Sequence, residues 1–291
     1  MIDVSVLVIN YNTAGLVKKC IESLLNQQDV NLEIIVVDNN SHDNSAVVLQ
    51  EFASRITLIS NQDNKGFGKA NNQAFKLSKG RYIFMLNPDA ACLTRKDLLH
   101  VMQFMDAHPE CGLAGTRIVN SHHQLAESAF YRYPRQKQVH LNFSDLPGLI
   151  ASVLGASMIV RREVFESLNG FDEDFFLYSE ETDLCLRIRK SGYMIGYCEA
   201  VTVQHAGSAS EKDNLPEEVL RKKKAGKLLF YRKHYPESDV RKMMRRDLFH
   251  ARFHLLRLML IKWVFGLNKK QQKRYHRQII ACDMTCDYLK S

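Results

Sequence analysis

Short apolar runs alternate with segments of helical periodicity along the first half of the chain. Val4–Ile9 and Glu33–Val37 are mostly β-branched, as is typical of strands that are buried on both faces. Leu16–Gln27, which lies between them, has apolar residues three and four positions apart, and this spacing predicts an amphipathic helix. The same alternation predicts further strands at 56–60 and 81–86 and further helices at 45–54 and 70–78. This order indicates a mostly parallel sheet with helices on both faces.

The second half of the chain continues the pattern less regularly. Ser179 is a typical helix N-cap residue and Gly192 a typical helix stop, so we expect a helix between them. Residues 120–145 are polar and aromatic with little periodicity, and we expect them to form a surface excursion near a site. The remaining expected elements are helices at 97–107 and 161–168, a strand at 112–119, an apolar segment at 151–160 and a strand at 194–203. The fold class predicted is α/β, with a doubly wound, mixed and mostly parallel sheet.

Charge divides the chain into two parts. Residues 1–220 hold 20 Lys and Arg against 27 Asp and Glu, whereas residues 221–291 hold 20 against 5. We therefore expect a body over 1–215 and a basic helical appendage over 216–291. A strongly basic region indicates an anionic partner.

The basic region also carries an apolar pattern. Residues 248–265 mix apolar side chains with Arg252, Arg257 and Lys262, which predicts a basic amphipathic helix in a bilayer interface. We expect residues 221–265 to bind an anionic membrane surface. A helical appendage that packs on the body or on another subunit is the alternative. No zinc-finger or RNA-binding signature accompanies the charge, so nucleic acid is not an expected partner.

The cysteines and the N-terminal residues indicate the cellular compartment in which the protein is expected. The seven cysteines are scattered and include no C-x-x-C pair, as expected for a reduced cytoplasmic protein. The first residues are acidic and enter a short β-branched run, unlike a signal peptide.

Polar clusters follow three of the predicted strands. They are Asn10-Tyr11-Asn12, Asp38-Asn39-Asn40-Ser41 and Asn87-Pro88-Asp89. One such cluster would be explained by a turn, because Asn, Asp and Pro favour turns. Three clusters at the carboxyl ends of strands predict a binding crevice, because open α/β sheets bind ligands at that edge.

Residues in three places carry candidate chemistry. Gly66 and Gly68 open a predicted helix whose N–H groups could meet a phosphate, although an ordinary loop would look the same. Asp89 offers the oxygen ligand that Mg²⁺ or Mn²⁺ prefers. Arg187 and Arg189 could bind phosphate or pair with Asp183.

Six motifs in order make the chain resemble the inverting family-2 glycosyltransferases, and within them the bacterial dTDP-rhamnosyltransferase-like members. They read V-x-V-x-N-Y-N, V-V-D-N-N-S, N-K-G-F-G-K-A-N-N, L-N-P-D-A, N-G-F-D-E-x-F-F-L-Y-x-E-E-x-D-L-C-L-R-x-R-x-x-G-Y and H-A-G-S. The resemblance covers about residues 1–210 and implies a fold of the GT-A type. It also implies a nucleotide-sugar-binding half over 1–120 and an acceptor and catalytic half over 121–215.

The resemblance implies roles for particular residues. Asp38 would accept a hydrogen bond from N3–H of a pyrimidine base. Asp89 and His205 would hold Mg²⁺ or Mn²⁺ together with the donor diphosphate. Glu181 would be the general base, with Glu180 as the fallback. The remaining donor-binding candidates are Asn10, Tyr11, Asn12, Asn64, Gly66, Phe67, Asn71 and Asn87. Asn87 and Glu181 both stand where the family usually has Asp.

The expected function follows from the resemblance and from the basic region. It is transfer of L-rhamnose from dTDP-β-L-rhamnose to a lipid-diphosphate-linked glycan, in bacterial surface polysaccharide synthesis of the O-antigen or capsule type. The enzyme would act at the inner face of the cytoplasmic membrane. A UDP-hexose donor is one alternative, and a non-catalytic nucleotide-sugar-binding or scaffold protein is another. A nucleotidyltransferase would need a Gly-rich N-terminal loop with Arg and Lys, and Asn10-Tyr11-Asn12 is not such a loop.

Overall fold

The structure is a computed structural model that describes residues 2–207 and 215–290. The described residues form two compact units. Unit 1 holds residues 2–133 and 143–207, and unit 2 holds residues 134–142 and 215–290. The sequence predicted one boundary near residue 215 and did not separate residues 134–142 from the body.

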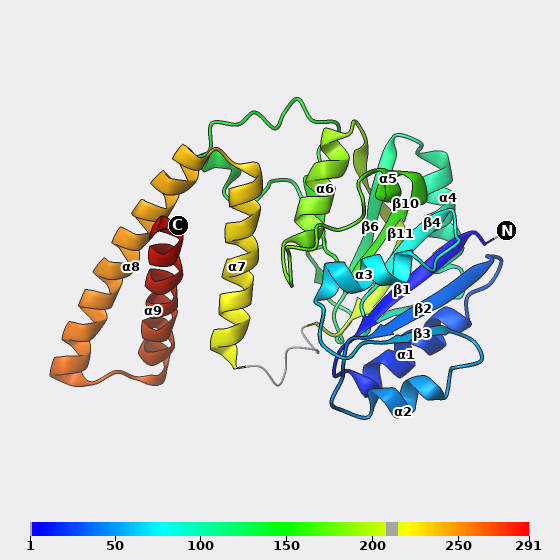
Figure 1. Ribbon diagram of the computed structural model, residues 1–291, viewed down its shortest axis with the longest axis horizontal. Coiled ribbons are helices and arrows are strands. Elements are labelled where there is room, and N and C mark those ends of the chain that lie inside the picture. The colour runs from blue at the N-terminus through cyan, green and yellow to red at the C-terminus, as the bar shows by residue number, and fades with distance from the viewer. Residues whose placement is uncertain (1, 208–214, 291) are drawn as a thin grey trace. The chain divides into compact units, whose positions relative to one another are not determined.

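Unit 1 is built on a nine-stranded sheet in the order β3-β2-β1-β4-β10-β6-β11-β5, with β7 paired to β6 (Figure 1). Strands β1 to β4 are parallel, whereas β10 runs antiparallel to β4 and β6, and β5 antiparallel to β11. A small second sheet pairs β8 with β9. The strands are β1 Val4–Asn10, β2 Leu32–Asp38, β3 Thr57–Ser60, β4 Tyr82–Leu86, β5 Ala90–Cys92, β6 Cys111–Val119, β7 Leu125–Ala126, β8 Ala129–Phe130, β9 Ser152–Val153, β10 Ser157–Arg161 and β11 Met194–His205.

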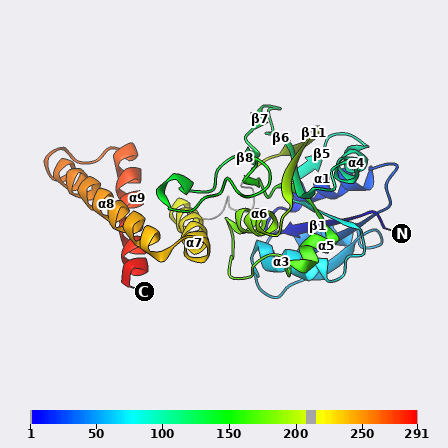
Figure 2. The ribbon, with the colours of Figure 1, turned by 90° about the horizontal axis from the view of Figure 1, so that it is seen from above.

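Helices cover both faces of this sheet, as Figure 2 shows. One face packs against α1, α2 and α4, and the other against α3, α5 and α6. The helices of unit 1 are α1 Ala14–Leu25, α2 Ser45–Gln50, α3 Phe67–Phe75, α4 Asp97–Ala107, α5 Arg162–Ser167 and α6 Glu180–Lys190, and unit 2 adds the short 3₁₀ helix Gln136–Gln138. The predicted α/β fold with a doubly wound, mixed sheet and C-terminal helices is confirmed.

The alternation along β1 explains how one strand serves two cores. Val4, Val6 and Val8 belong to the core under α1 and α2, whereas Leu7 and Ile9 belong to the core under α3 and α6. Successive side chains of a strand point to opposite faces, so a strand buried on both faces is apolar throughout. The pairing of β1 with β2 sets Asn10 beside Asp38 and so aligns two of the polar clusters.

Two local predictions are corrected. The helix expected over residues 70–78 runs over Phe67–Phe75 instead. A Cβ at Gly80 would lie 2.5 Å from the backbone nitrogen of Ser5, so this glycine allows the chain to approach β1 closely. The apolar segment 151–160 is not one strand, since residues 154–156 separate β9 from β10.

Unit 2 consists of α7 Pro216–His234, α8 Glu237–Phe265 and α9 Lys269–Lys290, together with residues 134–142. Helix α9 packs against both α7 and α8. The buried side chains of the unit include Phe230, Tyr231, Tyr235, Val240, Met243, Met244, Ala251 and Ile280. Within residues 2–207 and 215–290, none of the helices combines the length and the apolar character that crossing a bilayer requires.

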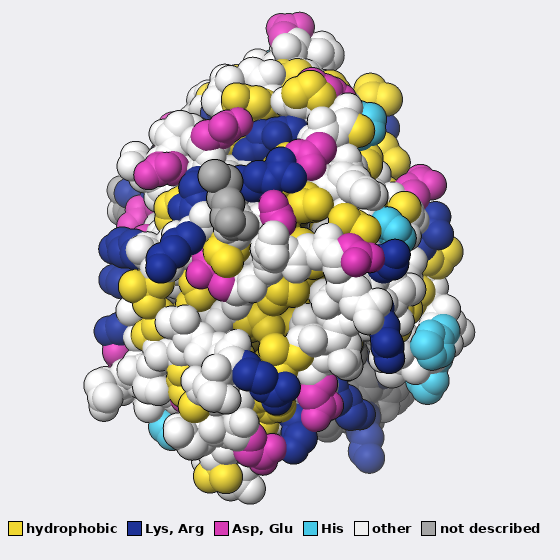
Figure 3. Space-filling model, turned by 90° about the vertical axis from the view of Figure 1, so that its right-hand side faces the viewer, with side chains coloured by type: hydrophobic (Ala, Val, Ile, Leu, Met, Phe, Trp, Pro, Cys, Tyr) yellow, Lys and Arg dark blue, Asp and Glu magenta, His cyan; other side chains and the backbone are white. Residues whose placement is uncertain are grey.

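The surface of the molecule is mixed in charge where Figure 3 views it. Lys and Arg side chains lie beside Asp and Glu side chains across that face. Unit 1 carries several such neighbours, including the ion pairs Arg81–Asp106 at 2.6 Å and Lys96–Asp29 at 2.9 Å. Exposed pairs of this kind contribute little to stability.

Candidate active site at the carboxyl edge of the sheet

Asp38 lies at the end of β2 in a buried polar network. Its Oδ1 accepts hydrogen bonds from Asn10 Nδ2 at 2.8 Å and from Ser41 Oγ at 2.6 Å. Within residues 2–207 and 215–290, the one contact of its Oδ2 is a long hydrogen bond of 3.3 Å from the backbone N–H of Ser41. Oδ2 therefore keeps the capacity to accept a further hydrogen bond from a ligand.

The loop after β1 is fastened to the loop after β2. The backbone N–H of Asn12 donates to Ser41 Oγ at 3.0 Å, and Asn12 Oδ1 accepts from the backbone N–H of His42 at 2.7 Å. Thr13 Oγ1 donates to Asn10 Oδ1 at 2.6 Å. Tyr11 is half-buried beside these contacts. Asn10 and Asn12 were predicted as donor-binding residues. In the structure they form hydrogen bonds that hold the loop after β1 to the end of β2 and the loop that follows it.

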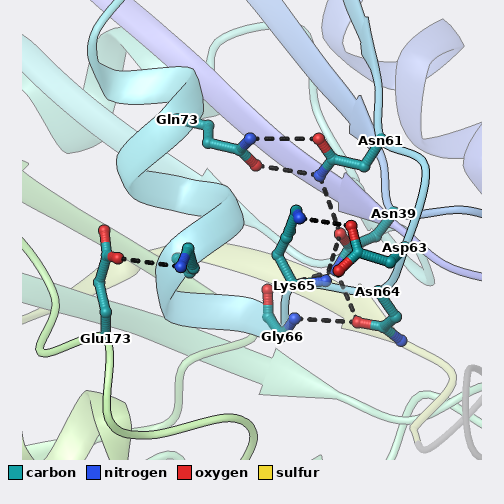
Figure 4. Close-up of polar contacts among 9 residues, drawn as sticks. Asn39, Asn61, Asp63, Asn64, Lys65, Gly66, Gln73 and Glu173 are labelled. Carbon is teal, nitrogen blue, oxygen red and sulfur yellow. Dashed lines mark hydrogen bonds and ion pairs between the residues drawn. The ribbon is translucent and has the colours of Figure 1, made fainter.

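A second amide network holds the loop that precedes α3, as Figure 4 shows. Asn39 Nδ2 donates to Asn64 Oδ1 at 2.8 Å and to the carbonyl of Gly66 at 3.2 Å. Asn39 Oδ1 accepts from the backbone N–H of Lys65 and from Asn61 Nδ2, both at 3.0 Å. Asn64 Oδ1 also accepts from the N–H of Gly66 at 2.9 Å. This network joins the end of β2 to the start of α3.

The start of α3 is packed against the loop before α6. The N–H of Phe67 donates to the carbonyl of Phe176 at 2.9 Å. This N–H group is therefore not available to bind a phosphate. Gly66 has φ +82°, and a Cβ there would lie 2.3 Å from the Phe176 oxygen. The Phe67 ring packs edge-on against Phe171. Asn71 is fully buried and donates to the Phe67 carbonyl at 3.0 Å, and its Oδ1 has no hydrogen-bond partner in the part of the chain that the structure describes.

Asn87, Asp89 and His205 are brought together although they are far apart in sequence. Strand β11 pairs with β5 so that His205 lies opposite Ala90. Asp89 Oδ1 lies 3.1 Å from His205 Nε2, and Asn87 Nδ2 lies 3.4 Å from the same nitrogen. The side chains of Asp89 and His205 are only 5% and 14% exposed.

This trio offers a carboxylate, an imidazole and an amide. Neighbouring ligands of an octahedral Mg²⁺ or Mn²⁺ site lie about 3 Å apart, because each bond is about 2.1 Å long. The 3.1 Å between Asp89 and His205 fits that arrangement. The described residues hold no group of three or more His, Cys, Asp or Glu side chains that could bind a metal ion on its own. The trio therefore fits an ion that takes further ligands from a diphosphate.

Glu180 and Glu181 open α6 after two residues in left-handed conformation, Tyr178 at φ 72° and Ser179 at φ 75°. Ser179 occupies the N-cap position but makes no side-chain cap bond. Glu180 is 5% exposed, and its Oε2 has no hydrogen-bond partner among the described residues. Burial, with a smaller contribution from Glu181, raises the pKa of Glu180 well above its usual value.

Glu181 has a different environment from its neighbour. Its side chain is partly exposed, and Thr182 Oγ1 contacts its Oε1 at 3.3 Å. Burial raises the pKa of Glu181 as well, while hydrogen bonds from the backbone and from Thr182 oppose the rise. Glu181 is thus a carboxylate that a ligand could reach.

Residues 155 and 156 connect the two acidic regions. The Ala156 carbonyl accepts a hydrogen bond from the N–H of Asn87 at 3.0 Å. A Cβ at Gly155 would lie 3.4 Å from the Cβ of Glu181. Asn87 and Glu181 therefore flank the same turn. This places the Asp89 and His205 pair, the Asp38 network and Glu181 at one edge of the sheet.

The arginines of α6 have structural partners. Arg187 Nε donates to Asp183 Oδ2 at 2.7 Å, and Arg187 Nη1 donates to the Leu168 carbonyl at 3.1 Å. Arg189 is buried and donates to the carbonyls of Leu146, Pro147 and Gly148. Of the two alternatives left by the sequence, the structure supports pairing with Asp183 for Arg187.

Sequence reasoning did not assign roles to Ser41, Asn39 or residues 155 and 156. Ser41 and Asn39 lie within the V-V-D-N-N-S motif, so that motif was the available signal. Gly155 and Ala156 lie in the segment 151–160, which the sequence predicted only as apolar. Their position between Asn87 and Glu181 depends on the antiparallel pairing of β10 with β4, which carries no local sequence signal.

Comparison with known proteins agrees with this architecture. The chain is 26% identical over 222 residues to rhamnosyltransferase WbbL of Escherichia coli (strain K12), covering 69% of this chain and 83% of WbbL. It is 26% identical over 185 residues to an uncharacterized glycosyltransferase of Rickettsia prowazekii (strain Madrid E), covering 62% of this chain. That match spans 57% of the Rickettsia protein, so this chain corresponds to little more than half of it.

The fold is also found among solved structures. The mannosyltransferase PcManGT from Pyrobaculum calidifontis, in complex with GDP-Man and Mn²⁺, superimposes with a TM-score of 0.61 at 15% identity. The superposition covers 98% of this chain and 86% of that one. A family model described as glycosyl transferase family 2 matches residues 5–168, which is more than half of the chain. The chain therefore belongs to glycosyl transferase family 2.

Proposed function

We propose that this glycosyltransferase is an inverting enzyme that transfers L-rhamnose from dTDP-β-L-rhamnose to a lipid-diphosphate-linked glycan in bacterial surface polysaccharide synthesis. The observation that carries the proposal is the meeting of Asp38, the Asp89 and His205 pair, and Glu181 at one edge of the sheet. A nucleotide-sugar site needs a contact for the base, a place for the diphosphate, and a base for the acceptor hydroxyl. Each requirement has a candidate there.

Asp38 would recognise the base of the donor. Its Oδ1 is saturated by Asn10 and Ser41, which fixes the carboxylate, and Oδ2 can accept the N3–H of thymine or uracil. Tyr11, half-buried at the end of the same strand pair, is the candidate for stacking on the base. Both pyrimidines present N3–H, so this contact alone does not separate dTDP from UDP.

Asp89 and His205 would hold Mg²⁺ or Mn²⁺, with Asn87 contacting the donor beside them. The bound ion would offset the negative charge that develops on the departing diphosphate. The asparagine in place of the family's first Asp leaves one carboxylate in the trio.

Glu181 would remove the proton of the acceptor hydroxyl. As the acceptor oxygen bonds to the anomeric carbon, the bond from that carbon to the diphosphate oxygen breaks on the opposite face. The proton passes to the Glu181 carboxylate and the electron pair leaves with dTDP, so a β-linked donor gives an α-linked product. Glu180 is a poorer candidate because its carboxyl group is covered by protein.

The choice of L-rhamnose is supported by the sequence motifs and by the likeness to WbbL. A UDP-hexose donor is the second candidate, because one methyl group on the base is worth only about 1–3 kcal/mol in a pocket. The basic helices of residues 221–265 support action at the inner face of the cytoplasmic membrane, where a lipid-linked acceptor would be met.

Calorimetric binding of dTDP, UDP and GDP, with and without Mn²⁺, tests the donor assignment. We expect dTDP to bind more tightly than GDP, Mn²⁺ to strengthen the binding, and Asp89→Ala to remove the effect of Mn²⁺. A clear preference for UDP would overturn the rhamnosyl donor and keep the enzyme class. Absence of binding for all three nucleotides would favour a non-catalytic role.

A further inference from the structure

Helix α8 carries an exposed apolar stripe along most of its length. Phe249, Phe253, Leu256 and Leu260 follow one another at intervals of four, three and four residues, so they share one face of the helix. Each is more than half exposed, and Trp263 at the end of the stripe is 86% exposed. The other side of α8 supplies buried residues such as Met244 and Ala251 to the core of unit 2. The stripe thus has no partner among the described residues.

A basic pocket lies on the same face, just before the stripe begins. Lys242 and Arg246 precede Phe249 by seven and three residues, which continues the helical spacing of the stripe. Together with Lys137, His140 and other residues they line a pocket of about 340 Å³, within the range of small-ligand sites. The full lining is Lys137, Gln138, Val139, His140, Lys242, Met243 and Arg246.

The pocket has a fixed wall because residues 134–142 are anchored to the helices of unit 2. Arg135 forms a bidentate ion pair with Asp247, in which Nη1 lies 2.5 Å from Oδ2 and Nη2 lies 2.7 Å from Oδ1. Tyr235 donates its hydroxyl to the Pro134 carbonyl at 2.7 Å. Asp239 accepts from the backbone N–H of His140 at 2.8 Å and contacts His140 Nδ1 at 2.7 Å. These contacts hold Lys137 beside α8.

The cations of the pocket are available to a ligand. Lys137, Lys242 and Arg246 are exposed, and none of them forms an ion pair with another described residue. Asp239, the carboxylate next to this segment, is occupied by His140. Lys242 also interacts electrostatically with Asp239. The three cations outnumber this carboxylate, and together they attract a multiply charged anion such as a phosphate or a diphosphate.

We propose that this pocket binds the phosphate-bearing headgroup of a membrane amphiphile whose hydrocarbon chain lies along the stripe from Phe249 to Trp263. The inference deepens the proposed function, on which it rests for the identity of the lipid, because a lipid-diphosphate-linked acceptor has this chemistry. A free phosphate would use the pocket alone. An amphiphile uses the pocket and the stripe together, and only the amphiphile accounts for their shared face.

Calorimetric titration of the full chain with farnesyl diphosphate, and separately with inorganic diphosphate, tests this assignment. Excess dTDP and UDP are present throughout to fill the site at the sheet edge. We expect farnesyl diphosphate to bind at least about tenfold more tightly than inorganic diphosphate, because only the former can bury apolar surface. Equal affinities would overturn the assignment to an amphiphile.

The pocket variant replaces Lys137, Lys242 and Arg246 by Gln. Basic residues attract a phosphate-bearing group, so the affinity for farnesyl diphosphate should fall by at least about tenfold when all three are removed. The matched control replaces Lys269, Lys270 and Lys273 of α9, which removes the same charge from exposed positions of the same unit. Its affinity should change less than about twofold. An equal loss in both variants, or no loss in the pocket variant, would overturn the proposal.

A variant of the stripe tests the contribution of the hydrocarbon chain separately from that of the diphosphate. Phe249→Ser with Phe253→Ser should weaken farnesyl diphosphate and leave the affinity for inorganic diphosphate unchanged. No weakening of farnesyl diphosphate would overturn the role of the stripe. These readouts do not depend on sugar transfer. A failure of the proposed function would therefore appear as absent turnover with the binding intact.

Discussion

At the scale of single residues, two adjacent carboxylates of α6 have opposite environments. Glu180 is enclosed and leaves Oε2 unpaired among the described residues, whereas Glu181 is partly exposed beside Gly155. Burial raises the pKa of both groups, and the closeness of Glu181 raises that of Glu180 further. A base must reach its substrate, so the structure favours Glu181 over Glu180 for that role.

Replacing Glu181 should abolish most of the transfer reaction. Glu181→Gln is expected to lower kcat by about 10²-fold or more and to leave nucleotide binding unchanged, because proton transfer is worth about 10²–10⁴ in rate. Glu199→Gln, at an exposed position of β11, is the matched control and should have no effect. A Glu181→Gln enzyme that keeps wild-type kcat would contradict this assignment.

The raised pKa of Glu181 also predicts a pH dependence. A general base acts in its deprotonated form, so kcat/KM should fall as the pH drops through the pKa of this group. Since burial raises that pKa, the acid limb of the profile should lie above pH 4.5. A limb at or below pH 4.5 would show that Glu181 does not control the rate.

Glu180 should make stability depend on pH in the opposite sense from an ordinary paired carboxylate. Its raised pKa means that the fold favours the protonated form, so this stabilisation is complete below pH 4.5 and is lost as the pH rises through the raised pKa. Glu180→Gln imitates the protonated form. Thermal unfolding should therefore show a higher Tm for this variant at pH 8, with a difference that shrinks toward pH 4.5. A lower Tm at pH 8 would contradict the cost assigned to burying this charge.

The sequence predicted some residues of the site well and others poorly. Asp38 and Asp89 were identified as polar residues at strand ends and His205 through the family resemblance, and the structure places all three at the same edge of the sheet. The burial of Asn71 was not predictable, because it depends on the loop before α6 folding over α3. The roles of Asp38, Asp89 and His205 in ligand binding remain predictions.

At the scale of elements, the contact between α3 and residues 170–179 organises the site. Asn72 Nδ2 donates to the Phe171 carbonyl and its Oδ1 accepts from the Phe171 N–H, both at 2.9 Å. Gly66 lies against the Phe176 carbonyl at the start of the helix. The loop that precedes α3 and the segment that leads into Glu180 are thus joined by α3.

Substitution of Gly66 should loosen this junction. Gly66→Ala imposes a positive φ on a residue with a side chain and drives its Cβ into the Phe176 oxygen, which should cost about 1–3 kcal/mol of unfolding free energy. The KM for the donor should rise at the same time. Gly15→Ala in α1 meets nothing within 4 Å and should raise stability by about 0.5–1 kcal/mol. Equal effects of the two substitutions on stability would contradict the importance of this contact.

Most elements were predictable because their patterns are local. The strands at Val4–Asn10 and Leu32–Asp38 follow from short, mostly β-branched apolar runs, and the helix at Ala14–Leu25 follows from apolar residues three and four positions apart. The direction of β10 was not predictable, because an apolar run has the same pattern in either orientation. The division of 151–160 into two strands was not predictable either, because β9 pairs with β8, which is distant in the sequence.

At the scale of the whole molecule, charge and exposed apolar surface gather in unit 2. The sequence located the basic region and its amphipathic helix from composition and spacing alone. It did not reveal that residues 134–142 belong with those helices, because the contacts of Arg135 with Asp247 and of His140 with Asp239 join residues about a hundred positions apart. The basic pocket on α8 depends on that long-range contact.

Membrane association should depend on both charge and apolar surface. The full chain is expected to sediment with vesicles that contain anionic phospholipid and to bind purely zwitterionic vesicles less. Salt should weaken the binding, because the Debye length falls from about 10 Å at 0.1 M to about 3 Å at 1 M. Binding that is equal on both kinds of vesicle and insensitive to salt would contradict the role of the basic helices.

The most direct test of the account is a transfer assay with dTDP-β-L-rhamnose and a lipid-diphosphate-linked glycan, followed by NMR of the product linkage. The wild-type enzyme and Glu199→Gln are expected to give an α-L-rhamnosyl product, and Glu181→Gln is expected to give almost none. A β-linked product, or full turnover by Glu181→Gln, would contradict the inverting mechanism with Glu181 as the base.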